Sequence, residues 1–149
     1  MKLYFIVVDE PFFHPVFLEK IINKERENIV GITILPDKSP KASFIKYLKK
    51  QYDFWGIKGF ILLSFKVVAY KFLDFFSKIY KFKKFFSVAS VARYHNLPIY
   101  RVENVNSEKH LDYLKDKNID LVISACGQIF DKKLLTIPQI GVINRHSSL

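Results

Sequence analysis

The chain has 149 residues, half of them hydrophobic and 16% aromatic, so its length fits one domain and its composition argues against intrinsic disorder. Its formal net charge is +10, but the segment 46–84 alone holds ten lysines and two acidic residues, a net charge of +8, so the basic excess is local. A single cysteine excludes an intramolecular disulfide, and no apolar run approaches the length of a transmembrane helix, so we expect a cytoplasmic protein.

The first 36 residues predict a strand, a helix and a second strand. The continuous apolar run Leu3–Val8 is typical of a strand buried on both faces of a parallel sheet. Pro15 can occupy the first turn of a helix that extends to about residue 24, and Ile29–Leu35 predicts the next strand. The order strand, helix, strand is typical of the beginning of an α/β fold.

The segment 41–86 interrupts that alternation with helical sequence. Apolar side chains recur at intervals of three and four at Ile61, Phe65, Val68, Phe72, Phe76 and Ile79. Charged residues fall on the opposite arc at Lys66, Lys71, Asp74, Lys78 and Lys81. We therefore predict an amphipathic helix with a basic face. Two interpretations stay open: the helix packs on the sheet with its Phe stripe buried and its lysines solvated, or it contacts an anionic membrane. Nucleic acid fits less well, because the aromatic residues are not interleaved with the lysines.

The remainder of the chain returns to alternating short elements. Helices are predicted over residues 87–95, 108–117 and 131–135, and strands over 97–100, 120–125 and Gly141–Asn144. The whole chain therefore predicts about five parallel strands with helices between them.

Polar sequence follows the last two predicted strands. The strand 120–125 runs into a loop made of Ala125, Cys126, Gly127, Gln128, Ile129 and Phe130. The last strand ends at Asn144, and His146 follows on the same side of an extended segment. Ligands of open α/β sheets bind at the carboxyl ends of strands. There an amide N–H can donate to an oxygen that becomes anionic, and an imidazole can move the proton of an attacking amine.

These residues resemble a known family. The run ACGQIF is similar to the folate-binding loop, and GVINRHSSL to the G-x-I-N-x-H-x-S-L-L-P motif, of folate-dependent formyltransferases such as methionyl-tRNA and glycinamide ribonucleotide formyltransferases. The similarity covers about residues 87–149, is looser over 1–36 and is absent from 46–84. It implies a Rossmann-like open, mostly parallel sheet of the formyltransferase type. Residues 1–149 would be a partial amino-terminal domain, incomplete at the C-terminus, with a Phe/Lys-rich helical insertion at about 41–86.

The resemblance also implies a reaction, formyl transfer from the co-substrate 10-formyltetrahydrofolate to a primary amine. The folate would lie against the loop 125–130, held mainly by backbone groups, while Asn144 steadies the oxyanion and His146 shuttles the proton. The family's third catalytic residue, an Asp that orients the histidine, belongs some tens of positions beyond residue 149. We therefore expect no formyltransferase activity from these 149 residues alone, since losing an orienting carboxylate can cost several powers of ten in rate.

The acceptor stays open at this stage. The turn after the first strand has no glycine and contains Asp9 and Glu10, which disfavours a phosphate-binding loop there. An amino sugar on a nucleotide carrier is one candidate, and an aminoacyl or ribonucleotide amine is another, with tRNA contacts only if further residues supply them. The alternative is a non-catalytic domain that binds folate or a partner.

Several polar residues have plainer interpretations. We expect Gly127 and Gln128 to shape the loop and Cys126 to be a small buried residue. His14, His95 and His110 are scattered without metal-ligand spacing, so they predict ordinary packed or surface residues, and we expect no metal site.

Overall fold

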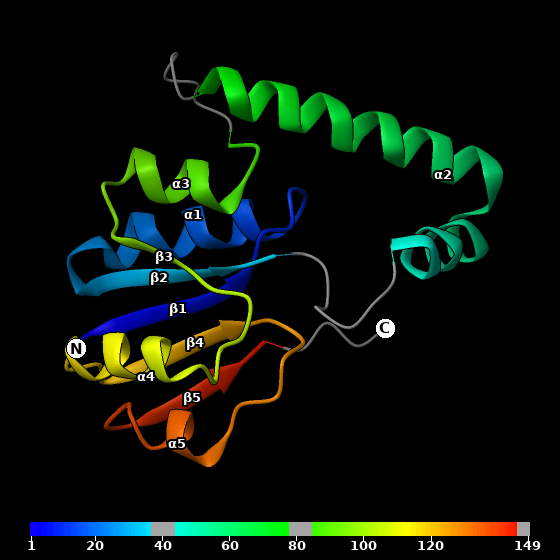
Figure 1. Cartoon of the computed structure of the whole chain (residues 1–149). Helices are drawn as coiled ribbons and strands as arrows, with labels where there is room; N and C mark the ends of the chain where they lie inside the picture. Colours follow the sequence, from blue (N-terminus) through cyan, green and yellow to red (C-terminus); the bar gives the residue numbers. More distant parts are fainter. Residues whose placement is uncertain (37–43, 78–84, 146–149) are drawn as a thin grey trace.

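The computed structural model of the protein describes residues 1–36, 44–77 and 85–145 (Figure 1). In chain order the elements are β1 (Leu3–Val8), α1 (His14–Glu25), the 3-10 turn η1 (Arg26–Asn28), β2 (Ile29–Leu35), α2 (Phe44–Ser77), α3 (Val88–Tyr94), β3 (Ile99–Arg101), α4 (Glu108–Lys115), β4 (Leu121–Ala125), α5 (Lys132–Leu135) and β5 (Gly141–Asn144).

The five strands form one parallel sheet in the order β3-β2-β1-β4-β5, which confirms the predicted α/β, Rossmann-like architecture. The order runs outward in one direction from β1 through β2 and β3, and in the other through β4 and β5. The connections leaving the carboxyl ends of β1 and β4 therefore diverge, and such a switch point is where open α/β sheets bind ligands.

Alternation along β1 divides the core into two layers. Leu3, Phe5 and Val7 face the apolar sides of α1 and α3, whereas Tyr4 and Ile6 face α4 and α5 on the other side of the sheet. In Figure 1, α1 and α3 lie near the top, next to β2 and β3, whereas α4 and α5 lie lower, beside β4 and β5. Burying a side chain such as Phe5 stabilises the fold by about 1.5–3 kcal/mol.

A chain of buried hydroxyl and imidazole groups crosses the layer between the sheet and α4. The Val105 carbonyl lies 2.6 Å from Nδ1 of His110, so Nδ1 donates, and Nε2 can accept from the Thr33 hydroxyl at 2.8 Å. Thr33 Oγ1 in turn accepts from the Tyr4 hydroxyl at 2.7 Å. Burial lowers the pKa of His110, which favours the neutral imidazole that this pattern requires. Gly31 leaves room for the Tyr4 ring, because a Cβ there would lie 2.9 Å from it.

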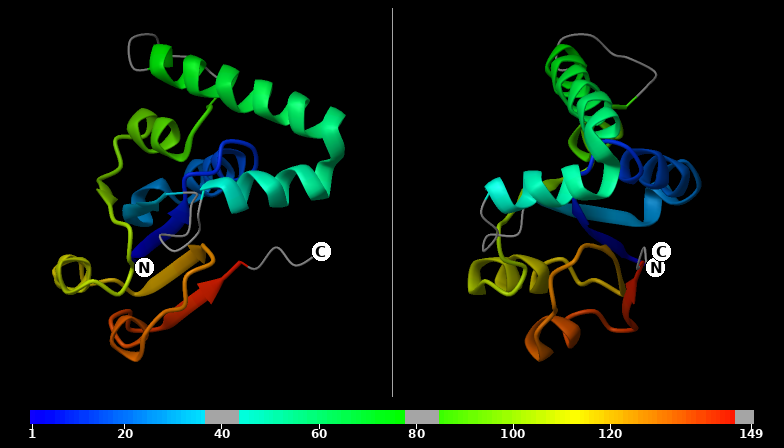
Figure 2. Two further views of the ribbon diagram at one scale, coloured as in Figure 1. Left: turned by 45° about the vertical axis from the view of Figure 1, so that its right-hand side comes forward. Right: turned by 90° about the vertical axis from the view of Figure 1, so that its right-hand side faces the viewer.

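Helix α2 differs from the predicted packing. It bends at Gly56, whose φ of 64° and ψ of 176° interrupt the helical backbone, and the long part after the bend runs along the outside of the α1/α3 layer (Figure 2). Of the two interpretations left open by the sequence, the one that buries the Phe stripe on the sheet is wrong. Phe65 is 77% exposed and Phe72 is 66% exposed, because the opposite side of the helix contacts the body of the protein. The predicted positions Ile79, Lys78 and Lys81 lie outside the described residues.

Candidate functional site

Asn144 lies beside the carboxyl end of β4. It is paired in register with Ser124, and the backbone N–H of the next residue, Arg145, donates to the Ser124 carbonyl at 2.7 Å. The loop 125–130 begins one residue after Ser124, so the structure brings the predicted amide next to the start of the predicted folate loop. Asn144 is exposed, as a group that meets a substrate must be. His146 lies outside the described residues.

Two side-chain amides hold the loop 125–130 against the segment that joins β3 to α4. Gln128 accepts from the Val105 backbone N–H at 3.0 Å and donates to the Glu103 carbonyl at 2.6 Å. Asn106 donates to the Ile129 carbonyl at 2.9 Å and accepts from the Asp131 backbone N–H at 3.0 Å. Gln128 therefore shapes the loop, as expected from the sequence. Asn106 was not predicted, because its role depends on a contact between segments more than twenty residues apart.

The loop 125–130 exposes two of its residues, Gly127 and Ile129, and buries the others wholly or in part. Ala125 is 4% exposed and belongs to the core under α1 and α3, and Phe130 packs against the opposite core. The Cys126 thiol is half-buried and lies 3.4 Å from the Ser124 hydroxyl. Gly127, in contrast, is exposed, and a Cβ built on it would meet no atom within 4 Å, while Ile129 is 87% exposed. A flat ligand could therefore approach the backbone at Gly127 and the side chain of Ile129.

The turn after β1 is organised by Glu10. Its carboxylate accepts hydrogen bonds from the backbone N–H groups of Phe12, Phe13 and His14 at 2.5, 2.8 and 3.1 Å. These are the donors at the amino end of α1 that a phosphate would otherwise use. His14 itself is held at this edge by a 2.8 Å contact in which Nδ1 donates to the Val8 carbonyl. The absence of a phosphate loop inferred from the sequence thus has a structural basis: a carboxylate fills that place.

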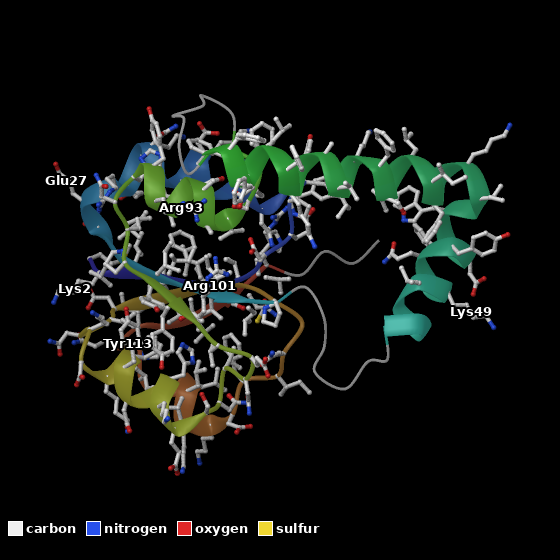
Figure 3. The ribbon with its side chains drawn as sticks, turned by 45° about the horizontal axis from the view of Figure 1, so that its top comes forward. Lys2, Glu27, Lys49, Arg93, Arg101 and Tyr113 are labelled. Carbon is white, nitrogen blue, oxygen red and sulfur yellow. The ribbon has the colours of Figure 1, made fainter. Side chains whose placement is uncertain are left out.

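Asp9 adds a second acidic group at the end of β1. Burial raises the pKa of its carboxyl group, although the Arg101 guanidinium, 3.7 Å away at the end of β3, acts in the opposite direction. Oδ1 of Asp9 is buried and has no hydrogen-bond partner within the described ranges. The labelled Arg101 can be seen at this side of the sheet in Figure 3. The carboxyl ends of the strands therefore bring together carboxylates that follow β1 and amides at the ends of β4 and β5.

No protein-family model matches the chain. A stretch of 63 residues is 36% identical to methionyl-tRNA formyltransferase. The relatives are the proteins of this name from Staphylococcus aureus strains JH1, MRSA252 and Newman, each matched over 42% of this chain and 20% of its own length. The chain thus spans about a fifth of the length of these curated relatives. The match supports the formyltransferase resemblance at the level of the family, and it leaves the acceptor undetermined.

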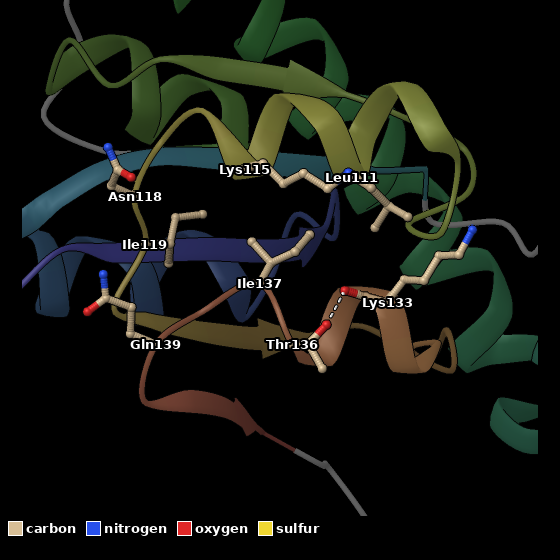
Figure 4. A pocket seen from close by; sticks show the side chains of 8 residues that line it. All are labelled: Leu111, Lys115, Asn118, Ile119, Lys133, Thr136, Ile137 and Gln139. Carbon is tan, nitrogen blue, oxygen red and sulfur yellow. Dashed lines mark hydrogen bonds between the residues drawn. The ribbon is translucent and has the colours of Figure 1, made fainter.

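A shallow pocket of about 390 Å³ lies at the other end of the sheet (Figure 4). It is bordered by α4 and α5 and by the segments that lead into β4 and β5, including Ile119 and Gln139. Since Ile119 and Gln139 precede the amino ends of their strands, this pocket is separate from Asn144 and the loop 125–130. Within the ranges that the structure describes, no group of three or more His, Cys, Asp or Glu side chains could hold a metal ion.

Proposed function

We propose that this chain carries part of the active site of a formyltransferase that uses 10-formyltetrahydrofolate as co-substrate and a primary amine as acceptor. The observation that carries the proposal is the pairing of Asn144 with Ser124, next to a loop that has open space beside its backbone at Gly127. The sequence similarity to methionyl-tRNA formyltransferase supports the same assignment.

The proposed reaction is a transfer between two nitrogens. The acceptor amine attacks the formyl carbon, the bond from that carbon to N10 of the folate breaks, and the proton lost by the amine ends on N10. Asn144 donates a hydrogen bond to the formyl oxygen while that oxygen is anionic. In other enzymes, removal of one such donor lowers kcat by about 10²–10³. His146 moves the proton. The loop 125–130 binds the folate through backbone groups, with its shape set by Gln128 and Asn106.

The acceptor that fits this edge best is an amine without a phosphate at the amino end of α1. Glu10 already occupies those N–H groups, so a phosphate would have to displace a carboxylate. The amine of an amino sugar or of an aminoacyl group meets this condition where the phosphates of its carrier are bound elsewhere. A ribonucleotide amine does so only if its phosphate is bound elsewhere.

Binding of 10-formyltetrahydrofolate, measured by calorimetry on the 149-residue chain, tests the proposal. Gly127→Val places a branched side chain in the open space beside the loop and should weaken binding at least tenfold. Lys133→Ala, in the separate pocket between α4 and α5, is the matched control and should leave the affinity unchanged. Absence of binding by the unmodified chain, or a loss caused only by Lys133→Ala, would overturn the assignment.

A second measurement addresses turnover. Formylation of a primary amine, followed by mass spectrometry, should be undetectable with residues 1–149, because the resemblance puts the Asp that orients His146 beyond them. Turnover by this chain would contradict the expected inactivity, and Asn144→Ala should then lower kcat by about 10²–10³. Binding of folate without turnover in any longer form of the protein would favour the non-catalytic alternative.

A further inference from the structure

Helix α2 exposes an apolar surface that formyl transfer does not explain. Of the twenty large apolar side chains that are exposed among the described residues, twelve belong to α2. Nine of them lie after the bend at Gly56 and are called here the outward arc: Ile57, Ile61, Leu62, Phe65, Val68, Phe72, Leu73, Phe75 and Phe76. Exposed apolar surface on this scale marks an interaction site in a folded protein.

Contacts on the opposite side of α2 fix the direction in which the outward arc faces. Tyr70 packs against Phe12 and Phe86 with ring centroids 5.3 and 5.5 Å apart. Asp74 accepts from the Ser87 hydroxyl at 2.6 Å and lies 3.4 Å from the Arg93 guanidinium. Figure 3 shows Arg93 near this anchored end of the helix and Lys49 at its far, bent end. Because Tyr70 and Asp74 face the body, the outward arc has to face away from it.

Lysines border the outward arc on both sides. With successive residues about 100° apart around the helix, Lys66 falls at one edge of the arc and Lys71 at the other, and both are exposed. Their alkyl stems can lie along the apolar surface while the ammonium groups reach outward to anionic groups. Lys58 lies within the arc, and the segment 46–84 carries a net charge of +8.

We propose that the outward arc of α2 binds an anionic lipid surface, lying in the plane of the interface. An apolar arc edged by lysines is the geometry of an interfacial helix. Trp55 and Tyr52, 53% and 47% exposed near the bend, are the residue types that sit at the level of lipid headgroups. A second copy of the chain fits less well, because two such arms would bring like charges together. Within the described residues, no helix is long and apolar enough to cross a membrane.

This inference does not rest on the formyltransferase assignment, and vesicle flotation tests it separately. The 149-residue chain is mixed with vesicles of phosphatidylcholine alone or of phosphatidylcholine with phosphatidylglycerol. It should float with the anionic vesicles at low salt and less at high salt. Phe65→Ser with Phe72→Ser should abolish flotation. Ile140→Ser removes an apolar side chain of similar exposure, 68%, from outside α2, and should float like the unmodified chain.

Removing charge provides a second, milder perturbation. Lys66→Gln and Lys71→Gln should each lower partitioning onto anionic vesicles roughly fivefold without changing the fold, which circular dichroism can verify. The proposal is overturned if the chain fails to float with anionic vesicles at low salt, or if the double serine variant floats normally. It is also overturned if light scattering shows a dimer that the double serine variant dissociates, since a second copy would then cover the arc.

Discussion

Replacement of Thr33 by Val tests the buried chain of hydrogen bonds between β1, β2 and α4. Thr33, Tyr4 and His110 all have zero exposure, so no water can replace the Thr33 hydroxyl. Valine keeps the shape of threonine and its preference for strands, and it removes only the hydroxyl. Nε2 of His110 is then buried without a partner, which costs about 1–3 kcal/mol, whereas the Tyr4 hydroxyl can still hydrogen-bond to the Tyr113 side chain. We therefore expect Thr33→Val to lower the free energy of unfolding by about 1–3 kcal/mol.

Matched variants separate the hydrogen bonds from the packing. Thr33→Ser keeps the hydroxyl and loses one methyl group, so it should cost only about 1 kcal/mol. Tyr4→Phe and Thr33→Val each remove the hydrogen bond between Tyr4 and Thr33, so the two changes together should cost less than the sum of the single changes. Urea denaturation followed by circular dichroism gives the three values. Equal stability of the valine and serine variants would refute the reasoning, because the hydroxyl would then contribute nothing.

Three further predictions concern pH, packing and the loop. Burial lowers the pKa of His110, so the unfolded chain takes up this proton at a higher pH than the folded chain. The free energy of unfolding should therefore be at its full value above about pH 6.5 and should decrease as the pH drops below it. Urea denaturation at several pH values between about 7 and 5 measures this dependence. Leu18→Ala, at zero exposure, should cost about 2–5 kcal/mol in thermal or urea unfolding, whereas Val16→Ala, 51% exposed on the same helix, should cost far less. Asn106→Ala should speed amide hydrogen exchange at Asp131, and Asn106→Asp, which keeps the accepting oxygen, should restore protection.

The sheet was predictable because its strands carry an unambiguous pattern. Leu3–Val8 is apolar at every position, which only a strand covered on both faces requires, and in the structure five of its six residues are buried. The polar ends of β4 and β5 were likewise visible in the sequence. Their adjacency follows from parallel pairing, since Ser124 and Asn144 each lie at the same end of neighbouring strands.

The features that sequence reasoning missed depend on tertiary contacts. Amphipathic spacing located α2, but it gave no information on which side of the helix would meet the body. The contacts of Tyr70 and Asp74 decide that, and they leave Phe65 outside. In the same way the sequence showed that Glu10 stands where a phosphate loop would need glycine, without showing that its carboxylate closes the amino end of α1.

The carboxylate of Glu10 also bears on the substrate. In many α/β folds the amino end of the first helix supplies the positive end of a dipole to an anion, whereas here Glu10 neutralises it. Asp9, partly balanced by Arg101, adds a second carboxylate at the same edge. Such an edge repels a phosphate and attracts an ammonium group, so the part of the acceptor that meets the end of β1 should be its amine. Measured affinities for amino compounds with and without a phosphate would separate the two cases: tighter binding of the phosphorylated compound would place the anion site elsewhere and remove this constraint on the acceptor.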